Sequence, residues 1–413
     1  MKKYKLGELI EVSRGASLCG YFYAASGKYI RLTCGNFDYH NNCFRENTSK
    51  DNLFYTGEFK EEFLLEKGDL ITPLTEQAIG LLGSTAWIPE SGKYIQSQDI
   101  AKIICNEELL DKKFAYYLIS SNMVKQQLSA AAQQTKIRHT SPDKIKDCTV
   151  WLPSLAEQKQ IGQLLFDIDR KIEINRAINH NLEAMAKQLY DYWFVQFDFP
   201  DENGKPYKSS GGKMVWNEKL KREIPQGWKD CKIKDFMRIF TGKKDVSKAV
   251  PGNYKFFSCA PEAITSNEYI YDGYAVLVSG NGSYTGRVGF YRGKFDLYQR
   301  TYACVLDEEV RNFPFFYYTL RYLFQPIYSG GKHGSSIPYI VLGDLSDFCF
   351  AFNETICKKF VDTVTPMFDE QLLRLPEIEK LTKQRHELLP LLMNGQVKVG
   401  VERSRLNYDL SYD

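Results

Sequence analysis

The sequence predicts an α+β protein that contains two homologous mixed α/β domains and two long helices, and three observations support this prediction. The length of 413 residues exceeds what one ordinary hydrophobic core occupies. Features of the first half recur in the second half in one register. Each half then ends in a segment with the heptad periodicity of a coiled coil. We therefore expect two domains separated by helices that pack as an antiparallel coiled coil, in a pseudo-twofold arrangement.

The composition is that of a folded chain with little net charge. Hydrophobic residues make up 43% and aromatic residues 14%, which excludes general disorder. The 54 basic residues nearly balance 51 acidic ones, so the net charge of +3 does not by itself indicate nucleic-acid binding. Such a role would have to come from local clusters of charge or from partners that supply positive charge.

Cysteine usage and hydropathy indicate a cytoplasmic protein. The 10 cysteines form no C-x-x-C pair and no Cys/His spacing typical of zinc sites, so they read as small hydrophobic residues of a reducing compartment. The amino-terminal segment MKKYKLGELIEVSRG has no apolar signal run. No other stretch reaches the length of about 18 apolar residues that a membrane span needs.

The internal repeat has an offset of about 200 residues, a period that indicates a duplicated domain. Gly92-Lys93-Tyr94 aligns with Gly293-Lys294-Phe295, and Tyr116-Tyr117 aligns with Tyr317-Tyr318 in the same register. Gln98 aligns with Gln299 in this register as well. After a shift of one residue, Ile137 aligns with Ile337, Ile145 with Leu345, and Asp147 with Asp347.

Each repeat is expected to mix strands with one amphipathic helix. Tyr29–Leu32 and Tyr274–Val278 are short, β-rich runs bounded by turn residues, which is typical of strands. The helical periodicity predicts a helix over Asp111–Leu128 and an equivalent helix over Phe313–Tyr328, broken late by Pro326.

The first long helix follows Leu152. Ser154 and Glu157 form an S-x-x-E capping box at its start. Apolar residues then alternate every four and three positions, with Asn175 and Asn179 as polar members that set register. The predicted seam is Ile161, Leu165, Ile168, Ile172, Asn175, Asn179, Leu182, Ala186, Leu189 and Trp193. About 40 helical residues would span roughly 60 Å.

The second long helix is expected over about residues 353–394, with Gly395 as its stop. Pro366 and Pro376 predict a kinked or segmented helix. The predicted seam is Val361, Val364, Phe368, Leu375, Ile378, Leu389 and Leu392. The alternative is that the two helices are independent edges of their domains. The resulting boundaries are 1–152, 153–196, 197–351, 352–395 and a tail over 396–413.

Motifs of catalysis are missing from the sequence. The glycine-rich run over residues 280–286 lacks the G-x-G-x-x-G spacing and a P-loop lysine. There is no G-x-S-x-G, no H-E-x-x-H and no N/D/S-P-P-Y/F tetrad, and none of the five histidines has a neighbouring Asp or Cys. We therefore expect no catalytic centre, no metal site and no bound cofactor in this chain.

Polar and basic residues of equivalent loops are the candidates for contacts with DNA, because Lys, Arg and Ser suit phosphates while Arg, Asn and Gln suit base edges. The candidates are Arg14, Lys136, Arg138, His139 and Thr140 in the first domain, and Lys243, Lys244, Asn281, Ser283, Tyr284, Arg287, Lys332, His333 and Ser335 in the second. Each could instead be a solvated surface residue. Gln98 and Gln299 could equally form a buried structural hydrogen bond.

These candidates are paired between the two repeats. Lys136, Arg138, His139 and Thr140 align loosely with Lys332, His333, Ser335 and Ser336. Arg14 aligns with Lys243 and Lys244, and the loop that contains Asn281 has Thr75-Glu76-Gln77 as its counterpart. The differing composition of the two loops is what two domains that read different sequences would show.

Four motifs around the long helices are specific. They are LPSLAEQKQIGQLL, the D-x-x-I-E-x-N run Asp169–Asn175, LYDYWFVQFDFP, and QRHELLPLLMNGQVKV over Gln384–Val399. With them the sequence resembles, over nearly its whole length, the DNA-specificity subunit of bacterial Type I restriction–modification systems. The order is that of the family: variable domain, conserved helix, variable domain, conserved helix.

The resemblance implies a non-catalytic subunit with two target-recognition domains, each reading one half of a bipartite target in double-stranded DNA. It implies that the helices set the spacer between the halves and dock two modification (methyltransferase) subunits. The implied docking residues are Gln158, Ile161, Asn175, Asn179, Trp193, Phe194, Leu389 and Leu392. S-adenosylmethionine would belong to the modification partner, and ATP and Mg to the restriction partner.

Two other functions stay open at this point. One is a coiled-coil adaptor that joins two protein-binding domains. The other is an enzyme with an unrecognised site, such as the recognition half of a fused restriction–methylation enzyme. Under the second alternative the purified chain alone would modify or cut DNA.

Overall fold

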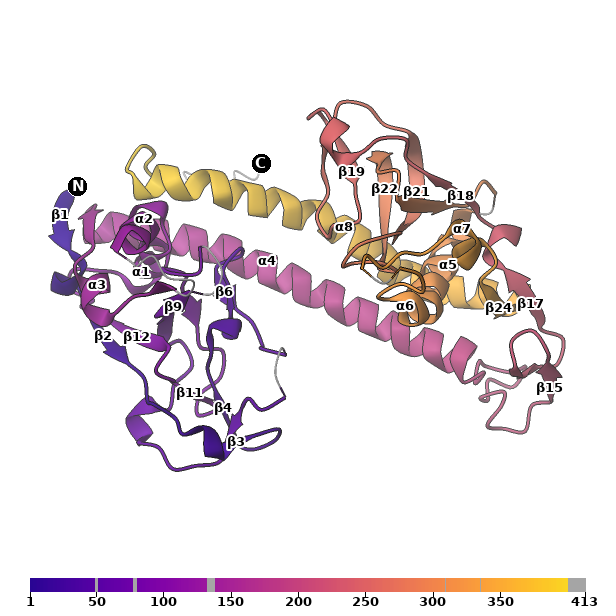
Figure 1. The fold of residues 1–413 in the computed structure, drawn as a ribbon, viewed down its shortest axis with the longest axis horizontal. Coiled ribbons are helices and arrows are strands. Elements are labelled where there is room, and N and C mark those ends of the chain that lie inside the picture. The colour runs from indigo at the N-terminus through magenta and orange to yellow at the C-terminus, as the bar shows by residue number, and fades with distance from the viewer. Residues whose placement is uncertain (49–50, 77–79, 132–137, 309, 335, 400–413) are drawn as a thin grey trace, which may run out of the picture. The chain divides into compact units, whose positions relative to one another are not determined.

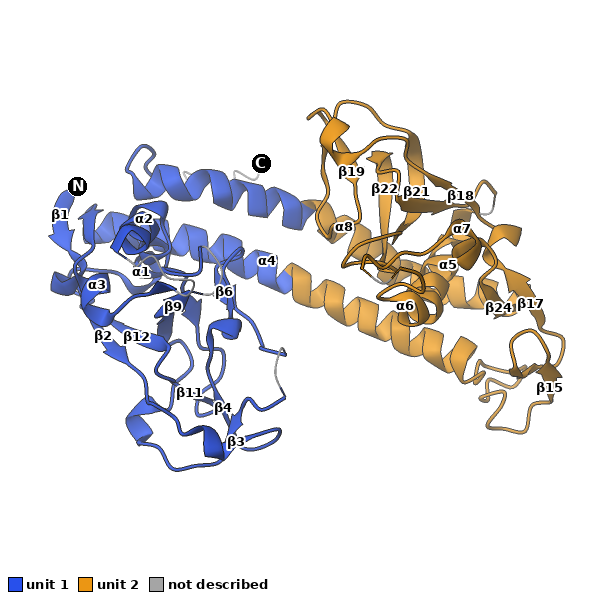
Figure 2. Ribbon diagram, in the orientation of Figure 1, with its two compact units in different colours: residues 1–174, 377–413 blue, residues 175–376 orange. Residues whose placement is uncertain are grey.

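The computed structural model describes residues 1–48, 51–76, 80–131, 138–308, 310–334 and 336–399 (Figure 1). The chain divides into two compact units, which Figure 2 shows in different colours. Unit 1 contains residues 1–174 and 377–413, and unit 2 contains residues 175–376. Because both boundaries fall inside the long helices, each unit holds a part of each helix.

Unit 1 is built from short strands in several small sheets. Its strands are β1 (Lys2–Lys5), β2 (Ile10–Arg14), β3 (Tyr23–Ala24), β4 (Tyr29–Arg31), β5 (Phe37–Asp38), β6 (Cys43–Phe44), β7 (Phe54–Tyr55), β8 (Leu70–Pro73), β9 (Thr75–Glu76), β10 (Ala86–Trp87), β11 (Tyr94–Ile95), β12 (Ile100–Cys105), β13 (Arg138–His139) and β14 (Thr149–Leu152). The larger sheets have the orders β10-β8-β12-β2 and β11-β4-β7-β3. The pairs β1-β14, β13-β9 and β5-β6 form two-stranded sheets.

The core of unit 1 joins its first sheet to helices. The short helices are α1 (Lys112–Ile119), α2 (Asn122–Ala131) and α3 (Pro142–Lys146), and 3-10 turns lie at Leu6–Glu8, Gly20–Phe22, Cys34–Asn36 and Glu61–Phe63. Phe114 and Leu118 of α1 are fully buried in one cluster with Leu165 and Leu392 of the long helices. The α/β domain of unit 1 and the parts of the long helices in this unit therefore share one hydrophobic core.

Unit 2 has a single large sheet. Its strands are β15 (Met214–Asn217), β16 (Arg222–Pro225), β17 (Lys229–Lys232), β18 (Arg238–Thr241), β19 (Tyr254–Phe257), β20 (Ile264–Ser266), β21 (Tyr271–Ser279), β22 (Val288–Leu297), β23 (Thr301–Val305) and β24 (Cys349–Phe352). Six of them form the sheet β18-β23-β21-β22-β19-β20, and β15-β16 and β17-β24 are separate pairs.

The core of unit 2 is rich in aromatic side chains. Its helices are α5 (Phe313–Thr319), α6 (Gln325–Tyr328) and α7 (Leu342–Ser346), with 3-10 turns at Ile233–Asp235, Val246–Lys248 and Val310–Asn312. Phe315 and Phe360 are fully buried, and both pack on Phe194, with ring centroids 4.9 Å and 5.1 Å away. Aromatic burial on this scale is a large source of stability.

The strand pairing shows that the two domains are duplicates. In unit 1, β12 pairs with β2 and β8, and Ala101 lies opposite both Arg14 and Thr72. In unit 2, β23 pairs with β18 and β21 in the same way, and Tyr302 lies opposite Thr241 and Val278. The expected repeat is therefore confirmed at the level of hydrogen-bonded register, and both expected strands, β4 and β21, are present.

Unit 1 and unit 2 differ in how the sheet continues. The single strand β22 pairs with β21 along one part and with β19 along another. Unit 1 has two short strands there, β10 and β11, separated by a segment that includes Pro89 and Gly92, and Gly92 has φ 70°. Proline has no N–H for a ladder and positive φ leaves the extended region, so the strand is interrupted.

The first long helix, α4 (Leu155–Tyr190), begins with the expected capping box. The Ser154 N–H donates to Glu157 Oε2 at 3.1 Å, and the Glu157 N–H donates to Ser154 Oγ at 3.4 Å. A π-helical turn, Asp191–Val195, ends the helix. Every residue of the predicted seam is buried or half-buried, and Ile161, Leu165, Ile172 and Ala186 are buried.

The second long helix, α8 (Glu354–Met393), is one uninterrupted α-helix. The expectation of a segmented helix is therefore wrong. Pro366 and Pro376 both lie on the exposed side of the helix, where water can reach the carbonyl oxygens that lose their N–H partners. Leu375 is also wrongly placed on the seam, because its side chain is 41% exposed. Gly395, with φ 68°, ends the helix as expected.

The two long helices run antiparallel in each unit. In unit 1, Asp169 contacts Arg385 and Lys171 contacts Glu377, at 2.9 Å and 2.5 Å. In unit 2, Arg374 Nη1 donates to Asn175 Oδ1 at 2.7 Å, and the Tyr190 ring lies 5.8 Å from Phe360. As the residue number rises along α4, the number of its partner on α8 falls. The polar seam residue Asn175 is thus satisfied by an arginine of the opposite helix.

The shorter helical segments depart from expectation. The segment expected as one helix over Asp111–Leu128 is split into α1 and α2, with Ser120 between them donating its hydroxyl to Tyr116 O at 3.0 Å. The equivalent segment is not broken at Pro326. It stays helical through a π-helical turn, Leu320–Phe324, and Pro326 lies in the first turn of α6, where its missing N–H is tolerated.

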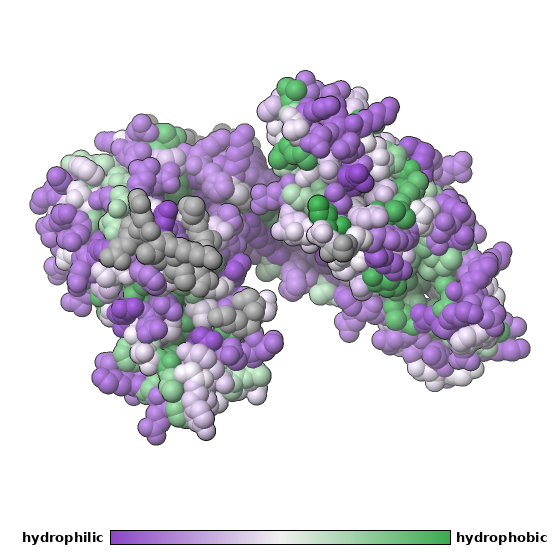
Figure 3. Space-filling view, in the orientation of Figure 1, coloured by the Kyte–Doolittle hydropathy of each residue, from purple (hydrophilic) through white to green (hydrophobic). Residues whose placement is uncertain are grey.

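The surface seen in Figure 3 is mostly hydrophilic on both units, with hydrophobic side chains in separate small patches. All ten cysteines are free thiols. Among the described residues, no helix has the length and apolar character needed to cross a membrane. The same part of the chain contains no group of three His, Cys, Asp or Glu side chains arranged to hold a metal ion.

Candidate nucleic-acid interface

Each unit has a polar edge where the central strands end. In unit 1, β8 continues into β9, which pairs with β13, so Thr75 lies opposite His139. In unit 2, the residues after β21 make the equivalent bridge, and Asn281 lies opposite Tyr339. We define the polar edge of unit 1 as Thr75, Gln98, Asp99 and His139, and that of unit 2 as Asn281, Gln299, Arg300 and Tyr339.

The polar edge of unit 1 is held by hydrogen bonds between its own residues. Thr75 Oγ1 donates to Asp99 Oδ1 at 3.0 Å and lies 3.4 Å from His139 Nδ1. Thr75 is buried, whereas His139 and Gln98 are exposed. Arg14 is exposed as well, and its Nε donates to Gln98 O at 2.8 Å. Three of the sequence candidates, Arg14, Arg138 and His139, therefore lie on or next to this edge.

Arg138 and Thr140 are tied to the protein. Arg138 Nη1 lies 3.7 Å from Glu76 Oε2 and donates to Ser129 Oγ at 3.1 Å. Glu76 is itself buried, and its Oε1 accepts backbone N–H groups of Gly80 and Leu81. Thr140 is only 7% exposed and its N–H donates to Leu74 O, so it helps to position the edge, and its contact with DNA stays a prediction. Lys136 lies outside the described residues.

In unit 2, the loop between β21 and β22 carries four candidates. Asn281 is half-buried, and its Oδ1 lies 3.1 Å from Cys259 Sγ. Ser283 is exposed, and so is Tyr284 at 47%. The Arg287 guanidinium lies 5.7 Å from the Tyr284 ring and donates to Ala260 O at 2.5 Å. Arg287 is half-buried, so this cation is only partly available to solvent, and its burial lowers the pKa from the ordinary value.

The other basic candidates of unit 2 differ in their availability. Lys244 contacts the carboxylates of Glu268 and Asp296, the latter at 3.1 Å, and its hydrogen bond to Glu268 raises its pKa. Its charge is therefore balanced inside the unit, and the expected contact of Lys244 with DNA stays a prediction. Lys243 is exposed.

His333 and Lys332 pack on aromatic rings beside the polar edge. His333 Nε2 lies 3.0 Å from Asp344 Oδ2, and its ring stacks on Tyr339 at 5.3 Å between centroids. The exposed Lys332 amine lies 4.2 Å from the centre of the Tyr328 ring. Ser335 lies outside the described residues.

The structure corrects two equivalences between the repeats. His139 corresponds to Tyr339, not to the segment that contains His333. His139 pairs with Thr75, shortly after β8, and Tyr339 pairs with Asn281, shortly after β21. Arg14 corresponds to Thr241, not to Lys243 and Lys244. Arg14 lies opposite Ala101, the second residue of β12, and Thr241 lies opposite Tyr302, the second residue of β23. Asn281 does correspond to Thr75, as expected.

Gln98 and Gln299 are both exposed, so the alternative of a buried structural hydrogen bond is wrong. They directly precede Asp99 and Arg300, which sequence reasoning missed. The backbone oxygen of Asp99 accepts the Leu74 N–H at 2.7 Å, and that of Arg300 accepts the Gly280 N–H at 2.9 Å. The repeated glutamines were the signal that could have drawn attention to their neighbours.

A repeated cysteine also escaped sequence reasoning. The segments YIRLTC (29–34) and YKFFSC (254–259) share their first and last residues, and both start on equivalent strands beside β11 and β22. Cys34 Sγ lies 3.3 Å from Thr75 O, and Cys259 Sγ lies 3.4 Å from Arg300 O. Each thiol therefore packs behind the polar edge of its own unit.

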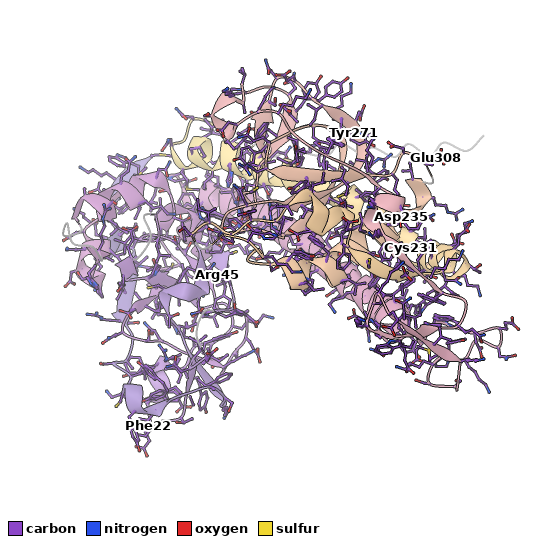
Figure 4. All side chains as sticks on the ribbon, turned by 45° about the vertical axis from the view of Figure 1, so that its right-hand side comes forward. Phe22, Arg45, Cys231, Asp235, Tyr271 and Glu308 are labelled. Carbon is purple, nitrogen blue, oxygen red and sulfur yellow. The ribbon has the colours of Figure 1, made fainter. Side chains whose placement is uncertain are left out.

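An exposed aromatic tip was not expected either. Tyr21 is 88% exposed and Phe22 39% exposed, in the loop before β3. Figure 4 shows Phe22 at the outer end of unit 1, away from Arg45. Large exposed aromatic side chains at a loop tip are available for contact with another molecule.

The helix residues that the resemblance assigns to docking lie mainly inside the protein. Six of them are at most 6% exposed: Gln158, Ile161, Asn175, Trp193, Phe194 and Leu392. Gln158 binds the Asp111 N–H and Leu109 O, and Trp193 packs on Phe360. The side chains of these six are buried inside their own units, and their role in docking stays a prediction. Asn179 and Leu389 are half-buried.

Comparison with known proteins points to one family. The sequence profile described as "Type I restriction modification DNA specificity domain" matches residues 1–184 and 225–351, more than half of the chain. The EcoDI specificity subunit of a Type I restriction enzyme from Escherichia coli is 34% identical over 181 residues, which cover 42% of this chain and 40% of that protein. The MjaIX specificity subunit from Methanocaldococcus jannaschii is 24% identical over 311 residues, covering 70% and 69%.

One solved structure shows a similar fold over nearly the whole length of the chain. The crystal structure of a Type I restriction–modification system S subunit from M. genitalium superposes with a TM-score of 0.63 at 16% identity. The superposition covers 95% of this chain and 95% of that chain. At this level of identity the similarity concerns the architecture, and it includes both domains and the long helices.

Proposed function

This chain belongs to the Type I restriction–modification DNA specificity family, and we propose on that premise that it directs a DNA methyltransferase to a two-part target. Each domain would read one half of the target in double-stranded DNA. The long helices would set the number of unread base pairs between the halves. The chain would carry no catalytic residues of its own.

The observation that carries this proposal is the pair of polar edges. Both lie at the same place in the duplicated fold, yet they hold different hydrogen-bonding groups. Unit 1 presents a carboxylate and an imidazole, from Asp99 and His139, and unit 2 presents a guanidinium and a phenol, from Arg300 and Tyr339. Base edges differ in their patterns of donors and acceptors, so equivalent surfaces with different side chains suit two different half-targets.

The exposed sides of the long helices are the proposed docking surface for modification subunits. In unit 2, Met185 is 53% exposed and Leu373 is 72% exposed, and in unit 1 Ile174 is 44% exposed. Large apolar side chains that face solvent from a helix suit packing against partner helices. The buried seam would then keep the two helices of this chain together while the outer side chains bind the partners.

The chemistry would come entirely from the partners. Methylation of a base amine requires extrusion of the base from the duplex into the active site of a methyltransferase, which would bind S-adenosylmethionine. A restriction partner would supply ATP-dependent translocation and cleavage with Mg. The positive charge for many phosphate contacts could also come from these subunits, which fits the net charge of +3 of this chain.

The test is to express the full chain with its modification subunits and to map methylated adenines in the host DNA. The expected result is a motif of two half-sites separated by a fixed number of unread positions. Removal of seven residues from the exposed middle of α4, with the matching seven from α8, should change that fixed spacing. A control strain expresses the modification subunits without this chain and should show no such motif.

Methylation that persists without the chain would overturn the proposal. A chain that binds modification subunits but leaves their DNA preference unchanged would instead support the adaptor alternative. The purified chain alone, incubated with DNA and S-adenosylmethionine, should neither methylate nor cut the DNA. Activity under these conditions would support the enzyme alternative.

A further inference from the structure

The strongest candidates outside the established family properties are the two residues that precede β12 and β23. Asp99 and Arg300 occupy one place in the duplicated fold, since each accepts an N–H from the residue that follows the neighbouring central strand. Each follows an exposed glutamine, Gln98 or Gln299. The two positions are therefore equivalent in the backbone and opposite in charge.

The surroundings of Asp99 present an acceptor to solvent. Asp99 is half-buried, and its Oδ1 accepts the Thr75 hydroxyl at 3.0 Å. Among the described residues no cation forms an ion pair with this carboxylate, so the second oxygen retains its capacity to accept. An ionised carboxylate offers acceptors only.

The surroundings of Arg300 present donors to solvent. Its side chain is exposed and forms no ion pair or hydrogen bond within the part of the chain that the structure describes. Its backbone is fixed at both sides, because its oxygen accepts the Gly280 N–H at 2.9 Å and lies 3.4 Å from Cys259 Sγ. A guanidinium offers donors only, in a planar fork that matches guanine O6 and N7.

Resting on the proposed function, we propose that Asp99 and Arg300 are specificity-determining residues of opposite polarity. Arg300 donates to a guanine in the half-target read by unit 2. Asp99 accepts from the N4 amine of a cytosine in the half-target read by unit 1, the contact that a carboxylate makes in the major groove. The two half-targets thus differ at one equivalent position because one duplicated backbone position carries opposite hydrogen-bonding groups.

Gln98 and Gln299 provide matched controls. They lie one residue away, are exposed and are identical in the two units. Because the same side chain stands at both places, it offers both half-targets the same hydrogen-bonding groups, unlike Asp99 and Arg300. We expect these glutamines to contact something that both half-targets share, such as the DNA backbone.

The experiment uses the full chain with its modification subunits and compares the methylated motif of the wild type with those of Arg300→Ala, Asp99→Ala, Gln299→Ala and Gln98→Ala. Arg300→Ala should relax one guanine position in one half-target by about 5- to 150-fold and leave the other half unchanged. Asp99→Ala should relax one cytosine position in the other half by a similar factor. The glutamine variants should change the extent of methylation without changing the motif.

The outcomes separate this inference from the proposed function. A wild-type complex without a bipartite motif would contradict the proposed function itself. A bipartite wild-type motif that Arg300→Ala leaves unaltered, or reduces equally at all sites, would overturn the inference alone, since a backbone contact has that effect. Circular dichroism of each purified variant must match that of the wild type, so that misfolding is not mistaken for altered reading.

Discussion

A largely buried ion pair between the two long helices in unit 1 allows a prediction about the stability of that unit. Asp169 of α4 and Arg385 of α8 lie 2.9 Å apart, with side chains only 19% and 9% exposed. Asp169 also accepts the Tyr117 hydroxyl at 2.7 Å, and Arg385 donates to Asn41 O at 3.0 Å. The pair therefore joins both helices to the body of the domain. We expect Arg385→Ala to destabilise unit 1, because it leaves a carboxylate buried without its cation.

The expected size follows from this burial. Removal of one partner from a buried ion pair costs about 3–5 kcal/mol, and the partial exposure of Asp169 favours the lower end. A loss of about 3 kcal/mol in a unit of about 200 residues lowers the melting temperature by about 6–12 °C.

In unit 2, apolar side chains occupy the positions equivalent to this ion pair. The helix caps are Ser154 and Asn353, and counting an equal number of residues from each cap places Phe368 at the position of Asp169 and Ala186 at that of Arg385. Both of these side chains are buried. Asp169→Phe added to Arg385→Ala should therefore recover most of the lost stability, because no charge is left buried.

The assay is calorimetric unfolding of the full chain, with hydrogen exchange of peptides from residues 1–174 to assign the transition to unit 1. The single variant should melt earlier in unit 1 only. A decrease of less than about 2 °C, or a double variant less stable than the single one, would refute the reasoning.

Three further predictions concern unit 2. A Cβ atom at Gly242 would lie 1.5 Å from Leu297 O, so Gly242→Ala should cost about 3 kcal/mol or more in urea unfolding, whereas Gly289→Ala, with nothing within 4 Å, should be neutral or slightly stabilising. Pro366→Ala should raise the free energy of unfolding by about 1–3 kcal/mol, because it restores a helical N–H on the exposed side of α8; an unchanged denaturation midpoint would contradict the account of the uninterrupted helix. Hydrogen bonds from two lysines lower the pKa of Asp347 from 3.8 to about 2, so their stabilising effect is complete above pH 3.8 and is lost as the pH falls toward 2. Asp347→Asn should flatten the acid side of the stability–pH curve, and an unaltered slope would count against the ion pairs.

The helices were predictable from the sequence because their signals are local. The capping box at Ser154, the stop at Gly395 and the seam of the first long helix appear in the structure where the spacing places them, whereas Leu375 of the second predicted seam is exposed. The effect of Pro366 and Pro376 on the second long helix is smaller than the sequence predicts. The sequence shows that Pro366 interrupts the hydrogen bonds of a helix, but not that its side of the helix faces water, which depends on the packing of the other side.

The residues of the two polar edges were less predictable from the sequence, because β-pairing is non-local and loop lengths differ between the repeats. The alignment placed Asn281 opposite Thr75 correctly, but it matched His139 to the wrong segment. Trp193 and Phe194 are predicted docking residues because a specific motif contains them, yet both are buried in unit 2. A motif shows that residues matter and does not show whether they face inward or outward.

The balance of charges at the two edges bears on how such a chain could bind DNA. Several of its cations near the edges are already engaged, Lys244 by two carboxylates and Arg138 by Glu76. Exposed cations of unit 2 that form no ion pair with another described residue nevertheless stand beside these, and Lys243, Arg300 and Lys332 are among them. Phosphate contacts give most of the affinity and nearly all of the salt dependence of DNA binding, whereas base contacts give specificity. On the proposed function, a chain with a net charge of only +3 and two differing polar edges would select the sequence, while partner subunits add contacts with the DNA backbone.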